Sequence, residues 1–419
     1  MKYLRTISTQ RLLALLAGVV VAAGGGTAIA VAAAGSGPVP PRESLAVAIH
    51  QALGAKSVTG ISARITFTNN LISSSDFQGG PSDPLLQGAS GRLWLSMAPG
   101  DHRLRIELQT ANGDGQVVVD NGRFWIYDPA SNTAYEGTLP SGAAAGAAGH
   151  ARAHETADTI PSIAKIQTEI NKIAQHVDLS RAIPSDVAGQ ATYTLQVSPK
   201  HDGGLLGDAQ LAWDAARGIP LRFAVYATGS STPVLELKAT DVSFGPVPAS
   251  DFAITPPSGA KIVRVSTAKL NATTARIARN GAYARRALAR HAEVTGVAAV
   301  ARRLPFTLNA PSKLVGLPRR SVSLLDWGGK PAALVTFGQN LGGIVVLEQS
   351  AGSSSPLPGS SSGGDHHGLT LPTVSIDGVT GQELDTALGT LVRFTRGGVS
   401  YTVVGSVPAA AADAAARGL

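Results

Sequence analysis

The chain contains no cysteine. Without a thiol it cannot form a disulfide, hold a metal through thiolates, use a cysteine nucleophile or carry a lipid anchor on cysteine. Charged residues are also scarce, at 15% of the 419 residues, but 44% of the residues are hydrophobic. This hydrophobic content excludes a disordered chain, and the length is sufficient for two ordinary domains.

Motifs that carry chemistry are equally scarce. The sequence has no Walker loop, no Rossmann glycine pattern and no EF-hand loop. Residues 359–363 match G-x-S-x-G in letters, but a nucleophile elbow requires a strand before the serine and a helix after it, and these flanks are rich in Ser and Gly. His366 and His367 lie in the same low-complexity stretch, without the surrounding groups that hold metal ligands. We therefore predict no enzymatic activity, no cofactor and no metal site.

The net charge of +7 is concentrated in one interval. Residues 266–303 contain eight Lys or Arg and a single acidic residue, so the remainder of the chain is neutral. The interval is rich in Ala and Arg and predicts an exposed, basic helical connector between two domains. Two alternatives remain open for it, contact with an anionic membrane or a solvated helix without a partner. Nucleic acid is not expected as a partner, because that role requires basic groups on a folded surface that carries aromatic residues.

The N-terminus reads as an export signal. Lys2, Arg5 and Arg11 precede an uncharged run that continues to residue 37. A cleaved signal peptide is one interpretation. The run also reaches the ~20 residues that span a bilayer, which favours a retained membrane anchor, although the glycines at 24–26 weaken it as a helix. Either way, we expect an extracytoplasmic protein, anchored to the cytoplasmic membrane or secreted.

The stretch from Gln116 to Tyr135 organises the first domain. Asn121 and Gly122 tolerate a left-handed backbone and lie between two short β-branched or aromatic runs, which predicts a hairpin. Further strands are predicted at 61–68, 92–97, 103–109, 191–198, 209–214, 221–227 and 233–244. Helices are predicted near 43–56 and at 161–177, where isoleucines repeat at helical spacing. Strands in runs with few helices indicate an antiparallel α+β domain.

Four segments carry a resemblance to a known family. Residues 91–108 (GRLWLSMAPGDHRLRIEL), 116–135, 211–222 (LAWDAARGIPLR) and 241–265 are similar, in order and spacing, to segments of the LolA-type lipoprotein carriers and the RseB-type regulators. The resemblance covers residues 43–265. It implies a strongly curved antiparallel half-barrel with covering helices and an apolar concavity for acyl chains.

A second, small α+β domain is predicted at 304–419. Strand-like runs occur at 322–326, 332–337 and 344–348, and the glycines at 397–398 predict a two-residue turn between two further strands. Residues 350–368 read as a flexible Ser/Gly loop. The final stretch, from Gly398 onward, resembles the C-terminal end of small domains of unknown function appended to bacterial envelope proteins and anti-sigma factors.

The strands of the first domain offer two alternating sets of large apolar side chains, and only one can line a concave face. Trp94, Trp125 and Tyr127 form one set. We favour the other, aliphatic set as the ligand-binding lining, with the 163–177 helix as its lid. With the lid residues the set comprises Leu93, Leu95, Leu104, Ile106, Leu108, Phe124, Ile126, Ile163, Ile166, Ile170, Phe223 and Val225.

These features predict a non-enzymatic protein that binds or transfers lipids or lipid-modified proteins outside the cytoplasm. The alternative is an RseB-like regulator of an anti-sigma factor that senses envelope stress, because the carriers are single domains whereas this chain has a second one. The partners would be a lipid or lipid-modified protein, the membrane and, in the alternative, the anti-sigma factor.

Overall fold

A computed structural model of the chain describes residues 37–71, 88–98, 101, 103–110, 113–129, 131–139, 160–265, 294–327, 330–352 and 371–419. The predicted export signal, most of the basic connector and most of the Ser/Gly loop lie outside these residues. Within the described ranges, no helix is both long enough and apolar enough to cross a membrane.

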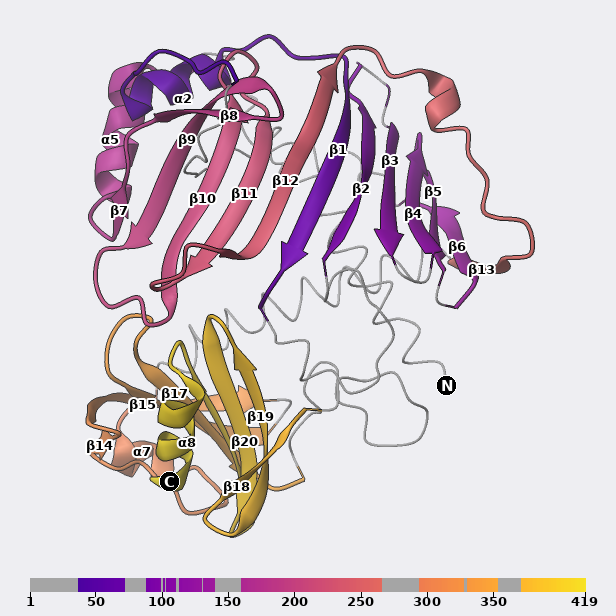
Figure 1. Cartoon of the computed structure of the whole chain (residues 1–419). Helices are drawn as coiled ribbons and strands as arrows, with labels where there is room; N and C mark the ends of the chain where they lie inside the picture. The colour runs from indigo at the N-terminus through magenta and orange to yellow at the C-terminus, as the bar shows by residue number, and fades with distance from the viewer. Residues whose placement is uncertain are drawn as a thin grey trace.

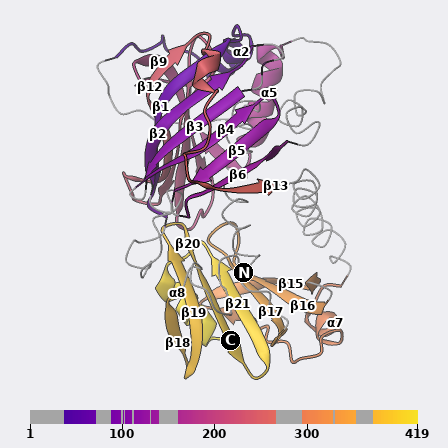
Figure 2. The same ribbon diagram turned by 90° about the vertical axis from the view of Figure 1, so that its right-hand side faces the viewer.

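A thirteen-stranded sheet forms the first domain of the described chain. Neighbouring strands run antiparallel except β13, which pairs with β6 in parallel. Figures 1 and 2 show the sheet curving round the side on which helix α5 lies. The α+β class that the strand pattern predicts is therefore confirmed, as is the curvature that the family resemblance implied. Its strands are β1 (Gly60–Asn69), β2 (Ala89–Ser96), β3 (Arg103–Thr110), β4 (Gly113–Asp120), β5 (Arg123–Asp128), β6 (Thr133–Thr138), β7 (Val177–Leu179), β8 (Ile183–Val187), β9 (Gln190–Pro199), β10 (Leu206–Asp214), β11 (Pro220–Ala227), β12 (Pro233–Phe244) and β13 (Lys261–Val265).

The predicted hairpin is confirmed as β4 and β5. Asp120 pairs with Arg123, so the turn consists of Asn121 and Gly122, whose φ angles are 45° and 89°. Both residues adopt the left-handed conformation that matches the right-handed twist of the flanking strands.

Two helices lie near the β9 edge of this sheet. Helix α2 (Leu45–Leu53) begins at Ser44, whose side chain accepts a hydrogen bond from the Val47 amide. Helix α5 (Ile163–Ile173) begins in the same way at Ser162. The helix predicted at 161–177 is therefore shorter than expected, because Val177 pairs with Pro199 as the first residue of β7.

The second domain is built on an eight-stranded sheet with the order β14-β15-β16-β17-β21-β20-β19-β18. Its core includes Phe337, Ile344, Val346, Val392 and Phe394, all fully buried or nearly so. Residues from 294 onward already pack on this sheet. The elements of this domain are α7 (Val297–Ala301), β14 (Lys313–Leu314), β15 (Leu317–Trp327), β16 (Lys330–Phe337), β17 (Ile344–Ser350), β18 (Thr373–Ile376), β19 (Val379–Thr386), β20 (Gly389–Arg396), β21 (Val399–Gly405) and α8 (Ala409–Arg417). The first domain also contains a 3-10 turn, η2 (Ala249–Asp251), between β12 and β13.

The two sheets touch through short loops (Figure 1). The Leu205 amide, in the β9–β10 loop, donates to the backbone carbonyl and to the hydroxyl of Ser406, at 3.1 and 3.0 Å. The Ala387 amide, in the β19–β20 turn, donates to the Leu71 carbonyl at the end of β1. The two domains thus meet at loop tips, chiefly through backbone groups, and each sheet keeps its own core.

Candidate ligand-binding face

The strand registers place the predicted aliphatic set on one face of the first sheet. Leu95 faces Leu104, which faces Val119, and Val119 faces Phe124 across β2 to β5. A second row joins Leu93, Ile106, Val117 and Ile126 in the same way. Directly paired residues project to the same side of a sheet, so both rows share one surface.

This surface continues across the middle of the sheet. Phe67 faces Leu237, Leu237 faces Phe223, and Phe223 faces Leu211 across β1, β12, β11 and β10. Val225 lies beside Phe223 in the next row, where it faces Leu235. The apolar rows therefore extend from β5 to β10, over strands that are far apart in the sequence.

The two halves of the surface differ in exposure. Leu104, Ile106, Phe124 and Ile126 are buried in one cluster with Leu93, Leu95 and Leu108 at its margin. By contrast, Phe223 is 44% exposed and Leu237 is 37% exposed. The buried half acts as core, whereas the β11–β12 half presents apolar side chains to solvent, which makes it the candidate binding surface.

Helices α2 and α5 cover the end of the same face at β9 and β10. Leu45 and Ala48 of α2 pack with Tyr193, Leu195 and Trp213 in one cluster, which Ile170 of α5 also joins. The two strand residues Leu195 and Leu211 pair across β9 and β10, which places the helices beside the exposed rows.

The isoleucines of α5 do not share one environment. Ile166 is 7% exposed and Ile163 is 42% exposed, so the helix buries only part of its apolar stripe. The His50 ring contacts the Pro161 carbonyl at 2.9 Å through Nδ1, which fastens the start of α5 to α2. Helix α5 is therefore held chiefly by α2, and Ile163 remains exposed.

The predicted aromatic set, Trp94, Trp125 and Tyr127, lies on the opposite face. The guanidinium of Arg105 stacks over the Trp94 ring, 4.5 Å from its centroid, and donates to the Asp251 carbonyl. Trp125 Nε1 donates to the Ile254 carbonyl at 2.9 Å. The segment between β12 and β13 thus covers this face, as Figure 2 shows. Further along the face, Arg222 pairs with Glu236 at 2.6 Å. Side chains here have protein partners, which leaves the aliphatic face as the candidate site.

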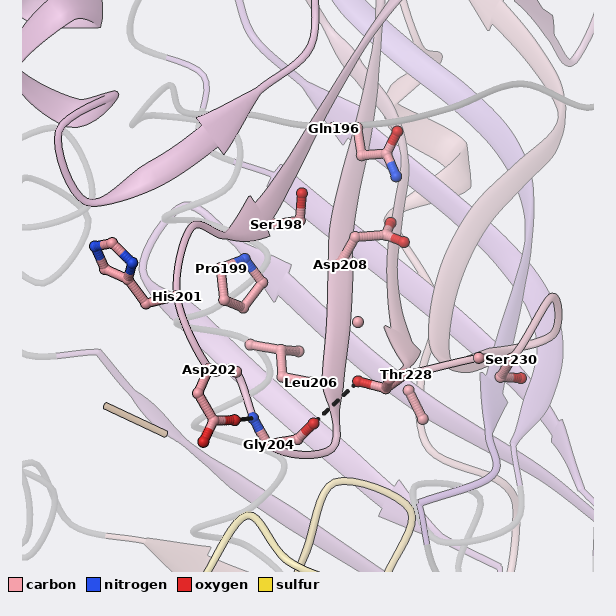
Figure 3. A pocket seen from close by; sticks show the side chains of 14 residues that line it. Gln196, Ser198, Pro199, His201, Asp202, Gly204, Leu206, Asp208, Thr228 and Ser230 are labelled. Carbon is pink, nitrogen blue, oxygen red and sulfur yellow. Dashed lines mark hydrogen bonds between the residues drawn. The ribbon is translucent and has the colours of Figure 1, made fainter. Parts of the chain in front are cut away.

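A polar pocket that the sequence did not predict lies on this second face, near the ends of β9, β10 and β11 (Figure 3). Its volume is about 440 Å³, and Gln196, Ser198 and Asp208 line one side of it. Its floor is a tight loop in which the Gly204 amide donates to Asp202 and the Gly204 carbonyl accepts from Thr228. No sequence signal marks it, because its residues meet only when three strand ends come together.

Across the described residues, no three His, Asp or Glu side chains gather in a way that could hold a metal ion. One buried carboxyl stands out in the second domain. Burial raises the pKa of Glu348 to about 7, although a hydrogen bond from the Asn309 amide opposes the shift. This group lies far along the chain from the aliphatic face and affects the stability of its own sheet.

Several solved structures show a likeness to this chain. The chain is similar to MucB in its complex with MucA from Pseudomonas aeruginosa, at 16% identity and a TM-score of 0.37, over 89% of this chain and 96% of that one. A LolA superfamily protein from Nitrosomonas europaea matches 51% of this chain and 98% of its own length, at 9% identity and a TM-score of 0.19. A putative outer membrane lipoprotein-sorting protein domain from Vibrio parahaemolyticus matches 50% of this chain and 96% of its own, at 12% identity and a TM-score of 0.21. No protein-family model and no curated protein matches the sequence.

Proposed function

We propose that the protein is a non-enzymatic, extracytoplasmic binder of acyl chains, carried by free lipids or by lipid-modified proteins, and that the ligand lies on the β11–β12 half of the aliphatic face. The observation that supports this proposal is the exposure of Phe223 and Leu237 in the middle of a continuous apolar surface. Solvent exposure of these apolar side chains is unfavourable, and covering them with an acyl chain contributes about 0.8 kcal/mol per buried CH₂.

The predicted lining then divides into two roles. Phe223 and Val225 would contact the ligand directly, and Ile163 would cover it from α5. The remaining strand residues, Leu93, Leu95, Leu104, Ile106, Leu108, Phe124 and Ile126, would form the packed base beside it. Ile166 and Ile170 would hold the helix in place through their own packing.

Binding of a fluorescent fatty acid by the delipidated full chain tests this proposal. Phe223→Asp places a carboxylate on the exposed rows, so the affinity should fall at least ~tenfold, while the melting temperature changes little because Phe223 is half exposed in the wild type. Val404→Asp is the matched control, because Val404 is 43% exposed on a strand of the second sheet. Equal affinities of Phe223→Asp and the wild type would refute this location, and a wild type that binds no probe would refute the function.

The second candidate is a regulator that binds an anti-sigma factor. It rests on the second domain, whose outer surface carries the exposed pair Val345 and Val404, followed by Leu391 and Leu384 across β17, β21, β20 and β19. In this interpretation the partner would be a counterpart of MucA, which forms a complex with MucB. Gene neighbours that encode a sigma factor and an anti-sigma factor would favour it, and Val404→Asp should then abolish capture of that anti-sigma protein while lipid binding persists.

A further inference from the structure

The first domain presents large apolar side chains to solvent at one end of its sheet. Leu53, at the end of α2, is 53% exposed, and Ile160, just before α5, is 47% exposed. The two lie together, because a β-carbon placed on Gly54 would come within 3.2 Å of Ile160 Cδ1. Met97, at the end of β2, is 37% exposed, and its amide donates to the Thr59 carbonyl at 2.9 Å. Three separate segments therefore contribute to one apolar tip, formed by Leu53, Met97 and Ile160.

The apolar tip lies at the end of the first domain that faces away from the second domain. Strand β1 begins beside the tip at Gly60. The chain that continues β1 ends at Leu71, whose carbonyl accepts from the Ala387 amide of the second domain. Ten residues of strand separate the two ends by about 33 Å. A flat surface can therefore reach the tip without touching the second domain, and Figure 1 shows α2 at this end.

Basic side chains flank the apolar tip. Lys56 follows Leu53 by three residues, and Lys165 lies on the first turn of α5; both are exposed. Helix α2 contains no acidic residue. The acidic residue of α5, Glu169, is paired with Lys172 at 2.8 Å. Lys56 and Lys165 therefore give the surroundings of the tip a positive charge.

The carboxylates at this end of the sheet are matched by arginines. Asp101, in the loop after β2, is paired with Arg103 at 2.5 Å. Asp120 is opposite Arg103 in the strand register. Asp214, at the end of β10, is buried and paired with Arg217 at 3.0 Å. These groups cancel one another, so they do not offset the charge of the two lysines.

The chain also enters the first domain at this end. Gly37 lies against Asp186 of β8, since a β-carbon on Gly37 would overlap the Asp186 carboxylate. Asp186 pairs with Ala191 at the start of β9, and the opposite end of β9 leads into the loop that contacts Ser406 of the second domain. The export segment predicted before residue 37 therefore joins the domain on the side of the tip, where an anchored chain would hold the tip close to the bilayer.

We propose that the apolar tip docks on the surface of an anionic lipid bilayer, with Leu53, Met97 and Ile160 in the interface and the two lysines at the lipid phosphates. Exposed aliphatic side chains beside basic ones suit a membrane interface, because the apolar groups leave water while the charges meet anionic head groups. This docking goes beyond the proposed function, since it would bring the protein to the membrane whether or not the aliphatic face holds a ligand.

The absence of cysteine allows a single thiol-reactive dye to report on the tip. Leu53→Cys and Ile160→Cys replace exposed side chains, so the full chain should fold unchanged. With vesicles of phosphatidylglycerol and phosphatidylcholine, an environment-sensitive dye at either site should shift its emission to shorter wavelength and be quenched by spin-labelled lipid. Leu341→Cys is the matched control, because Leu341 is 50% exposed between β16 and β17 of the second domain, and its emission should not change.

The lysines give a second readout. In the Leu53→Cys background, Lys56→Gln should weaken docking on these vesicles about fivefold, because a basic side chain near an anionic surface contributes about 1 kcal/mol. Lys313→Gln, an exposed lysine of β14, is the control and should leave docking unchanged. Vesicles of phosphatidylcholine alone should give a smaller shift than the anionic vesicles.

The outcomes separate docking from ligand binding. Emission at Leu53 and Ile160 that does not respond to vesicles, or a response of the same size at Leu341, overturns the tip as the docking surface. Equal responses to anionic and neutral vesicles overturn the anionic bilayer as its partner. Phe223→Asp, which should weaken fatty acid binding, should keep the shift at Leu53; loss of that shift would mean that the dye reports on the aliphatic face and would refute docking.

Discussion

Glu348 makes the stability of the second domain depend on pH. It lies on β17 between two strands, fully buried, and its Oε2 accepts a hydrogen bond from the Asn309 amide at 3.0 Å. Its Oε1 has no hydrogen-bond partner among the described residues. Loss of hydration penalises the charged form, and burial therefore raises the pKa from the ordinary value of 4.5 to about 7.

The sign of the effect follows from proton binding. Between pH 4.5 and 7 the unfolded chain releases this proton while the folded protein retains it, so the folded state binds more protons and the free energy of unfolding falls as the pH rises. The stabilisation of the folded state by protonated Glu348 is fully present below pH 4.5 and is lost as the pH rises through 7. The difference between the two pKa values corresponds to roughly 3 kcal/mol.

Glu348→Gln is the test, because the amide keeps the shape and cannot ionise. Hydrogen exchange of the β17 amides, corrected for the intrinsic pH dependence of exchange, reports the opening free energy of this sheet without assuming that both domains unfold together. We expect the wild type to lose about 2–3 kcal/mol between pH 4.5 and 8 and the variant to lose less than about 1 kcal/mol.

Glu169→Gln serves as the control, because Glu169 lies on α5 with its side chain about half exposed, and it should leave the β17 profile unchanged. A variant whose profile falls as steeply as that of the wild type would show that Glu348 is not the responsible group.

Two further predictions concern the first domain. Asn121→Ala forces a residue with a β-carbon and no local polar side chain into the left-handed turn at φ 45°, so chemical denaturation should show a loss of about 1 kcal/mol, and Asn121→Gly should restore most of it. Ile166→Ala should cost about 2–5 kcal/mol because Ile166 is buried, whereas Ile163→Ala should change the unfolding free energy by less than about 0.5 kcal/mol and weaken lipid binding instead. Equal losses of stability for the two isoleucine variants would contradict the division of α5 into a packed and an exposed side.

Local signals in the sequence determined the elements of the fold. The Asn121–Gly122 turn follows from the residues themselves, because few others adopt positive φ in two successive positions. The alternation along β2 to β5 likewise determined that the aliphatic and aromatic sets project to opposite faces, since successive side chains of a strand must alternate. These are short-range effects, and no other part of the chain is needed to produce them.

The tertiary structure alone decided which of these residues are exposed. Phe223 and Phe124 have the same place in the alternating pattern, yet Phe124 is buried and Phe223 is half exposed. The difference arises because Phe124 packs in a cluster with Leu104, Ile126 and Val265, neighbours that only the folded chain brings together. The end of α5 before Val177 also depends on pairing with β9, which lies more than ten residues away in the sequence. The cluster around Trp213 forms where α2 meets β9 and β10, and only long-range packing brings those three segments together.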